Sequence, residues 1–152
     1  MRVMPGTGEA GCGLCRGGAV KGKFISIGRT RLFESSGLRV AQSKLQDEGY
    51  AIASKDGNLF VLGGATRGPI NAVYALLEED LGCRWYSRFS QKIPSMPTLR
   101  FRPVTRSYAP ALEIRDPFYW EAFDGTWSLR NRTNSSAASV PVEWGGNKHY
   151  AM

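Results

Sequence analysis

The stretch YAIASKDGNLFVLGGATRGPINAVYALLEEDLG, residues 50–82, decides the fold. Two largely apolar runs, residues 50–54 and 58–64, flank Lys55-Asp56-Gly57. An Asp-Gly pair between such runs is typical of a β-hairpin, because the tight turn needs backbone conformations with positive φ. The second run is continuously apolar over residues 59–62, which predicts a strand buried on both faces.

The same stretch continues into a predicted helix over residues 67–82. Pro69 suits the first helical position, with Gly68 or Thr66 as the cap, and Gly82 suits the position just after the last turn. The apolar side chains recur with helical spacing and form one stripe of Ile70, Val73, Tyr74, Leu77 and Leu81.

Shorter elements are expected before and after this unit. Residues 23–28 predict a short strand, and residues 29–49 predict a loop with one helical turn at most. Residues 83–87 predict another short strand. Residues 91–110 contain four prolines and predict an extended linker.

The C-terminal part is expected to hold a strand over residues 111–116 and a short helix around residues 126–130. The predicted fold class is therefore α/β (α+β), a small sheet with a hairpin and a packed helix. We expect three parts, which are an irregular segment 1–22, a partial α/β domain 23–107 and a C-terminal part 108–152.

Composition excludes several classes of protein. The net charge is +7, but the Lys and Arg residues are scattered along the chain, which indicates a solvated surface rather than a nucleic-acid site. Nothing resembles a membrane span or a signal peptide, so we expect no membrane partner, and the cellular location stays open. The chain has three cysteines, and such a small, odd number argues against a disulfide framework.

Several short motifs lack the context that their chemistry requires. Residues 6–11 match the dinucleotide pattern G-x-G-x-x-G, but no strand precedes them. Residues 63–68 are followed by Pro69 and Ile70 instead of the Lys-Ser/Thr pair of a phosphate loop, so they predict a tight turn. Cys12 and Cys15 have the spacing of half a zinc site, without a second pair, and His149 is the only histidine. We therefore expect no cofactor, no metal and no catalytic residue in this chain.

One stretch, residues 110–132, combines aromatic rings with charged and amide side chains. Sugar-binding sites use both, because flat rings stack on C–H-rich faces while carboxylates, amides and guanidinium groups bind hydroxyls. The alternative is a packing corner with salt-bridged charges, and the residues alone favour neither. The candidate glycan-binding residues are Arg115, Asp116, Tyr119, Trp120, Trp127, Arg130 and Asn131.

Two parts of the chain resemble a known family. Residues 53–87, with Gly63-Gly64, Arg67-Gly68, a Tyr-containing helix and GCRWY, resemble the N-terminal domain that precedes the barrel of α-glucuronidases and β-hexosaminidases. The likeness is greatest to a large bacterial family of unknown function with the same layout. Residues 110–134 resemble the start of that family's (β/α)₈ barrel.

The resemblance implies that the chain is a truncated piece of a glycoside hydrolase. It implies that Arg115, at the position of an arginine that contacts sugar hydroxyls in β-hexosaminidases, ends the first barrel strand. A barrel needs about 250 residues, so the stretch after Pro110 supplies about one unit, and the catalytic carboxylates would lie on later strands.

The resemblance also implies the partners. They would be the remainder of the barrel and a glycan, one that carries uronic acid or N-acetylhexosamine, and the parent enzyme would be secreted or periplasmic. The alternative function is a self-standing carbohydrate-binding or interaction module. A basic nucleic-acid binder is the weakest hypothesis, because no cluster of Lys and Arg supports it.

Overall fold

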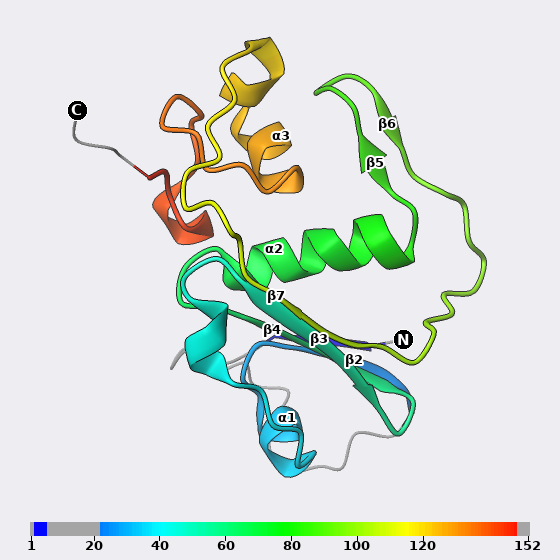
Figure 1. Ribbon diagram of the computed structural model, residues 1–152. Coiled ribbons are helices and arrows are strands. Elements are labelled where there is room, and N and C mark those ends of the chain that lie inside the picture. Colours follow the sequence, from blue (N-terminus) through cyan, green and yellow to red (C-terminus); the bar gives the residue numbers. More distant parts are fainter. Residues whose placement is uncertain (1, 6–21, 149–152) are drawn as a thin grey trace.

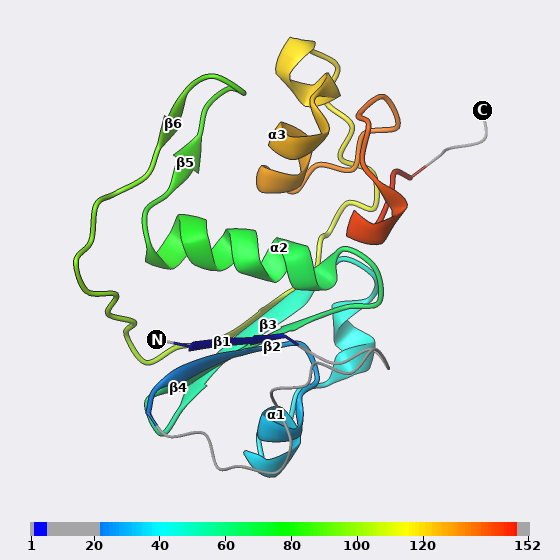
Figure 2. The ribbon, with the colours of Figure 1, turned by 180° about the vertical axis from the view of Figure 1, so that it is seen from behind.

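The computed structural model describes residues 2–5 and 22–148 and has a mixed α/β fold in layers (Figure 1). A five-stranded sheet has the order β1-β2-β4-β3-β7. Helix α2 covers one face of this sheet, and the short helix α1 lies under the other (Figures 1 and 2). The strands of the sheet are β1 (Arg2–Pro5), β2 (Phe24–Ile27), β3 (Tyr50–Lys55), β4 (Asn58–Gly63) and β7 (Thr105–Tyr108).

The predicted hairpin forms the centre of the sheet. β3 and β4 pair antiparallel, with Lys55 opposite Asn58 at the turn. Asp56 and Gly57 both have positive φ, 52° and 72°, as a two-residue turn that follows the strand twist requires. All four apolar residues of β4 from Leu59 to Leu62 are buried, so the prediction of a strand covered on both faces is confirmed.

The outer strands correct two predictions. β1 pairs parallel with β2, so residues 2–5 are not irregular although they fall within the segment predicted to be so. β7 pairs antiparallel with β3, so the predicted linker ends in a strand of the sheet. Ser54 fixes the start of this pairing, because its hydroxyl and main chain both bond to Val104.

The two faces of β4 belong to two separate cores, as the alternation of side chains along a strand requires. On the side of α2 (Gly68–Ala75), Val61 packs with Ile52 and Leu76. On the side of α1 (Arg31–Ser35), Phe60 meets Phe33 edge to face, within a cluster of Phe24, Phe33, Leu45, Ala51, Phe60 and Leu62. A 3₁₀ turn, η1 (Gln42–Leu45), supplies Leu45 to this second core.

Helix α2 packs on the sheet with its small residues and with Val73 of the predicted apolar stripe. Ala72 and Ala75 are fully buried in the sheet-side core. The backbone comes very close, since a Cβ on Gly68 would lie 2.6 Å from the carbonyl oxygen of Gly49. Two stripe residues, Ile70 and Tyr74, instead pack outward against the C-terminal part of the chain.

The helix continues as a wider π-turn, η2 (Leu76–Asp80), and ends where Gly82 takes a φ of 72°. Three acidic residues on this turn bind arginines from later in the chain. Asp80 and Glu79 bind Arg106 on β7, and Glu78 binds Arg132 at 2.7 Å. The end of α2 is thereby tied both to the edge of the sheet and to the C-terminal layer.

Residues 109–148 form a third layer that lies on α2 (Figure 1). It contains η3 (Trp120–Phe123), the confirmed helix α3 (Gly125–Arg130) and η4 (Val142–Trp144). Leu129, Ala138 and Val140 pack on Ile70 and Tyr74 of α2. The strand predicted over residues 111–116 is wrong, because that segment is irregular and pairs with no strand of the described chain.

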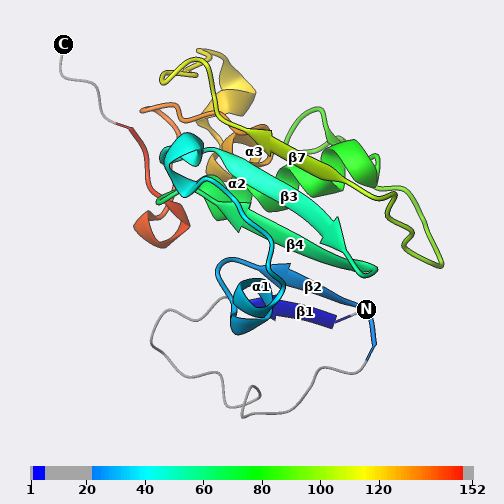
Figure 3. The same ribbon diagram turned by 60° about the horizontal axis from the view of Figure 1, so that its bottom comes forward.

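A small separate hairpin stands beside the third layer. β5 (Arg84–Trp85) and β6 (Gln91–Lys92) pair antiparallel, which confirms the short strand predicted within residues 83–87. Trp85 is buried edge to face on Tyr74 of α2, at 5.4 Å between ring centroids. Figure 3, turned so that the lower face comes forward, shows β1, β2, β4, β3 and β7 side by side, with α1 on that face.

Tyr50 links the sheet to the π-turn and makes stability depend on pH. Its hydroxyl donates to Glu79, and burial, followed by the charge of Glu79, raises its pKa from 10.0 to about 12. The neutral phenol is therefore favoured in the folded state. Its contribution is complete below pH 10 and is lost as the pH rises from about 10 toward 12.

We therefore expect the free energy of unfolding to fall more steeply between pH 10 and 12 in the wild type than in Tyr50→Phe, which cannot titrate. Urea unfolding at a series of pH values measures this difference. Tyr86→Phe is the matched control, because it removes the same hydroxyl group from a tyrosine that is 63% exposed. Parallel curves for the wild type and Tyr50→Phe would contradict the expectation.

Candidate functional site

The structure divides the seven predicted glycan-binding residues between two places. Arg115 and Asp116 lie near the junction of the sheet and the third layer. The other five, Tyr119, Trp120, Trp127, Arg130 and Asn131, lie on or near α3 and the β5–β6 hairpin. Two pockets correspond to these places, one charged and one aromatic.

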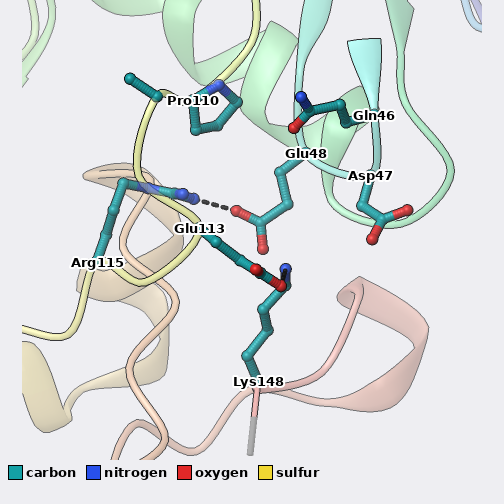
Figure 4. A pocket seen from close by; sticks show the side chains of 8 residues that line it. Gln46, Asp47, Glu48, Pro110, Glu113, Arg115 and Lys148 are labelled. Atoms are coloured by element: carbon teal, nitrogen blue, oxygen red, sulfur yellow. Dashed lines mark hydrogen bonds and ion pairs between the residues drawn. The ribbon is translucent and has the colours of Figure 1, made fainter. Parts of the chain in front are cut away.

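The charged pocket is a cavity of about 300 Å³ around Glu48 (Figure 4). Figure 4 shows the Glu48 side chain between Arg115 on one side and Asp47 on the other. Its lining combines carboxylates with cations and comprises Gln46, Asp47, Glu48, Pro110, Ala111, Glu113, Arg115 and Lys148.

Glu48 is only 5% exposed, so its charge needs partners. Arg115 forms an ion pair with it, and the Asn134 amide lies 3.3 and 3.4 Å from its two oxygens. Arg115 also donates to the main-chain oxygens of Leu112 and Arg132. Most of the donor capacity of Arg115 is therefore used to hold the third layer together.

At the rim of this pocket, Lys148 donates to Glu113 at 3.0 Å. That hydrogen bond raises the pKa of Lys148, so the amine stays charged at neutral pH. Asp116 lies outside the lining and accepts a hydrogen bond from Ser136 at 3.2 Å. The charged pocket thus consists mainly of groups already paired with one another.

Trp127, Arg130 and Asn131 attach the β5–β6 hairpin to α3. Trp127 is buried and donates its indole N–H to the main-chain oxygen of Tyr86 at 3.4 Å. Asn131 donates to the Trp85 oxygen at 3.3 Å, and the Arg130 guanidinium lies 5.9 Å from the Trp85 ring centre. These contacts are packing contacts, so we do not include the three residues in the candidate binding site.

Tyr119 is half-exposed and packs edge to face on Trp127, with 5.5 Å between ring centroids. Burial, and then the charge of Glu121, raises the pKa of its phenol. Tyr119 therefore stays a neutral hydrogen-bonding group over the physiological range. Tyr119 precedes the pocket residue Trp120 in the chain but does not itself line the aromatic pocket.

The aromatic pocket is a cavity of about 460 Å³ at the start of α3. Trp120 is 67% exposed and Trp144 is 48% exposed, so large parts of both indole rings are accessible. Polar groups stand among the rings. The full lining comprises Arg88, Trp120, Phe123, Asp124, Gly125, Thr126, Ser139, Pro141 and Trp144.

Arg88 reaches this pocket from the loop of the β5–β6 hairpin. Its guanidinium lies 4.7 Å from the Phe89 ring centre and 5.5 Å from that of Trp120, within the range of cation–π attraction. Within residues 2–5 and 22–148 it makes no hydrogen bond or ion pair. Stacking thus holds a guanidinium in place while its N–H groups stay available to a ligand.

Asp124 has two roles at the pocket. One carboxylate oxygen accepts from the Trp127 main-chain N–H at 2.7 Å and caps α3. The other oxygen accepts no hydrogen bond from the described part of the chain. Thr126 and Ser139 add two exposed hydroxyl groups.

Sequence reasoning missed Arg88 and Trp144 in this site. Trp120 was predicted because aromatic and charged residues crowd the segment 110–132. Arg88 and Trp144 lie outside that segment, and only the fold brings them to it. A weak signal existed in both cases, an arginine beside a phenylalanine in a hairpin loop and a tryptophan followed by two glycines.

The described part of the chain contains no candidate metal site. No group of three or more His, Cys, Asp or Glu side chains within residues 2–5 and 22–148 could hold a metal ion. Cys12, Cys15 and His149, and the motif at residues 6–11, lie outside the described residues. Among the described helices, none has the length and apolar character that crossing a bilayer requires.

Comparisons of this chain with protein-family models, with curated proteins and with solved structures gave no match.

The paired carboxylates of the charged pocket should differ sharply in their effect on stability. Glu48→Ala would leave Arg115 and Asn134 without their buried partner, and we expect a loss of about 3–5 kcal/mol. Glu113→Ala removes an exposed pair with Lys148 and should cost about 1 kcal/mol or less. Urea denaturation of both variants measures these values, and equal losses would rule out Glu48 as the internal anchor.

Proposed function

We propose that this chain binds carbohydrate at the aromatic pocket, as the non-catalytic N-terminal part of a glycoside hydrolase. The observation that carries the proposal is the pocket's composition. Two accessible indole rings, those of Trp120 and Trp144, line one cavity together with the free guanidinium of Arg88. The resemblance of residues 53–87 to the domain that precedes such barrels supports the same assignment.

The groups in the pocket match both the apolar C–H surface and the hydroxyl groups of a sugar ring. Indole rings present flat, apolar surfaces to C–H groups, while Asp124, Thr126 and Ser139 can bind hydroxyls. A cavity of about 460 Å³ lies within the range common for small-molecule sites. The pocket therefore has the size and the mixed character that a saccharide unit requires.

The proposal assigns binding rather than hydrolysis to this chain. Glycoside hydrolysis usually needs two carboxylates at a fixed separation across the scissile bond. Asp124 is the one carboxylate that lines the described pocket, and one of its two oxygens caps α3. In the proposed enzyme, the catalytic carboxylates would lie on barrel strands beyond the residues of this chain.

A self-standing carbohydrate-binding module would use the same pocket, so the two forms of the proposal share one binding test. They differ in genetic context, because only the hydrolase requires strand–helix repeats encoded in frame or next to this chain. A nucleic-acid binder would instead bind DNA or RNA with an affinity that falls steeply with salt.

Removal of either accessible indole should weaken glycan binding. We expect Trp120→Ala and Trp144→Ala each to raise the Kd for an oligosaccharide identified on a glycan array by about tenfold or more. Isothermal titration calorimetry measures the change. Tyr86→Ala is the control, because Tyr86 is an exposed aromatic residue that does not line the pocket. Binding that survives both Trp substitutions unchanged would refute the assignment of this pocket.

Arg88 should favour acidic sugars over neutral ones. A carboxylate on the sugar can accept charge-assisted hydrogen bonds from its free N–H groups. We expect Arg88→Gln to raise the Kd of a uronate-containing oligosaccharide about tenfold while its neutral analogue changes little. The matched control is Arg102→Gln, an exposed arginine before β7. Equal losses for the acidic and neutral sugars would contradict this role.

A further inference from the structure

We infer that Arg67 is a positioning residue that sets the separation of the two aromatic walls of the binding pocket and thereby its affinity for a glycan. The inference rests on the proposed function. Arg67 does not line the pocket and is 2% exposed, so it would act through the residues it holds.

Two chain segments form the facing walls. The first wall is residues 120–126, which carry Trp120 and the start of α3, and the second is residues 139–144, which carry Trp144. They touch at Gly125, where an added Cβ would overlap the main-chain oxygen of Ser139. The two segments are therefore closely packed at this point, and the separation of their indole rings also depends on what anchors each segment.

One guanidinium anchors both segments. Nη1 of Arg67 donates to the main-chain oxygen of Thr133 at 2.6 Å, just after α3. Nη2 donates to the main-chain oxygen of Gly146, just after η4, and lies 3.5 Å from the Asn147 side-chain oxygen. A planar guanidinium donates in fixed directions, so the two carbonyl groups are held in a fixed relation to each other.

The contact at Gly146 reaches Trp144 through a closed turn. Trp144 and Gly146 both donate their N–H groups to the Pro141 oxygen, at 3.0 Å each. Gly145 packs directly on Arg67, since an added Cβ would overlap Cγ of the arginine. Movement of the arginine would therefore move the turn that carries the indole.

The first wall is tied in a similar way. Thr133 donates and accepts hydrogen bonds with Ser128 of α3, and its N–H donates to the Ser128 oxygen at 2.9 Å. The link from Arg67 thus enters α3 at Ser128, in the second half of the helix. The start of that helix lies in the pocket.

The main chain around Arg67 is fixed to the segment just before β3 and to the first turn of α2. The Gly68 N–H donates to the Asp47 oxygen at 3.2 Å, and the Arg67 oxygen accepts from the Asn71 N–H at 2.9 Å. Asn71 in turn donates to the Glu48 oxygen at 2.9 Å. Together with the Glu48–Arg115 and Glu78–Arg132 ion pairs, the Arg67 side chain joins the third layer to the rest of the fold.

Three variants and one spectroscopic probe test this role. Arg67→Lys keeps the charge but cannot hold two carbonyl groups with one planar fork. Gly145→Ala leaves Arg67 intact and displaces the turn that it holds. Gly146→Ala is the matched control, since it places alanine at positive φ in the same turn, with Val142 at an ordinary 3.8 Å. The probe is 5-fluorotryptophan, which gives one ¹⁹F signal for each of the four tryptophans, and Trp144→Phe and Trp85→Phe assign the signals of these two residues.

We expect Arg67→Lys and Gly145→Ala to raise the glycan Kd about fivefold or more and to shift the Trp144 signal, while Gly146→Ala does neither. The Trp85 signal should stay in place in all three, which shows that the fold is intact. The inference is overturned if the wild type binds and Gly145→Ala binds like Gly146→Ala. If the wild type binds no glycan, the proposed function fails, while the shift of the Trp144 signal still decides whether Arg67 positions that ring.

Discussion

The arrangement of the layers depends on the buried carboxylate of Glu48, which requires charged and polar partners. Glu48 lies just before β3, almost fully enclosed, and Arg115 and Asn134 are its partners from the third layer. Its main-chain oxygen accepts from Asn71 of α2. Because an uncompensated charge in an interior is very costly, the sheet, the helix and the third layer must assemble together around it.

The buried arginines also depend on partners from other segments. Four arginines work inside the molecule, since Arg67, Arg106, Arg115 and Arg132 are each at least partly buried and each bind main-chain oxygens or carboxylates of another segment. A guanidinium suits this work because its five N–H groups can satisfy several acceptors at once. Carboxylates neutralise Arg106, Arg115 and Arg132, so these three arginines do not account for the net charge of +7. The number of arginines is therefore a weak guide to nucleic-acid binding in this chain.

Local chemistry made part of the fold predictable. The hairpin of β3 and β4 follows from the Asp56-Gly57 turn, and α2 follows from helical spacing and the glycine at its end. β7 was not predictable from its own residues, because its side chains are mostly exposed and its pairing partner is distant in the chain. Residues 111–116 show the opposite error, since an alternating pattern cannot form a strand without a neighbour to pair with.

The binding site was also only partly predictable. Composition located Trp120 but could not show that Trp127 packs inward or that Trp144 lines the pocket.

The pairing of β3 with two partners also sets an order of events during folding. The turn to β4 closes a loop of two residues, a hairpin of the kind that forms within microseconds. Ser54 and Val104, which join β3 to β7, lie 50 positions apart, so that closure costs more chain entropy. The centre of the sheet can therefore exist before its far edge, and a newly made chain would carry β3 as an open edge until residues 105–108 arrive. Over that interval β3 is the strand most available to a wrong partner, and its full pairing depends on segments made much later.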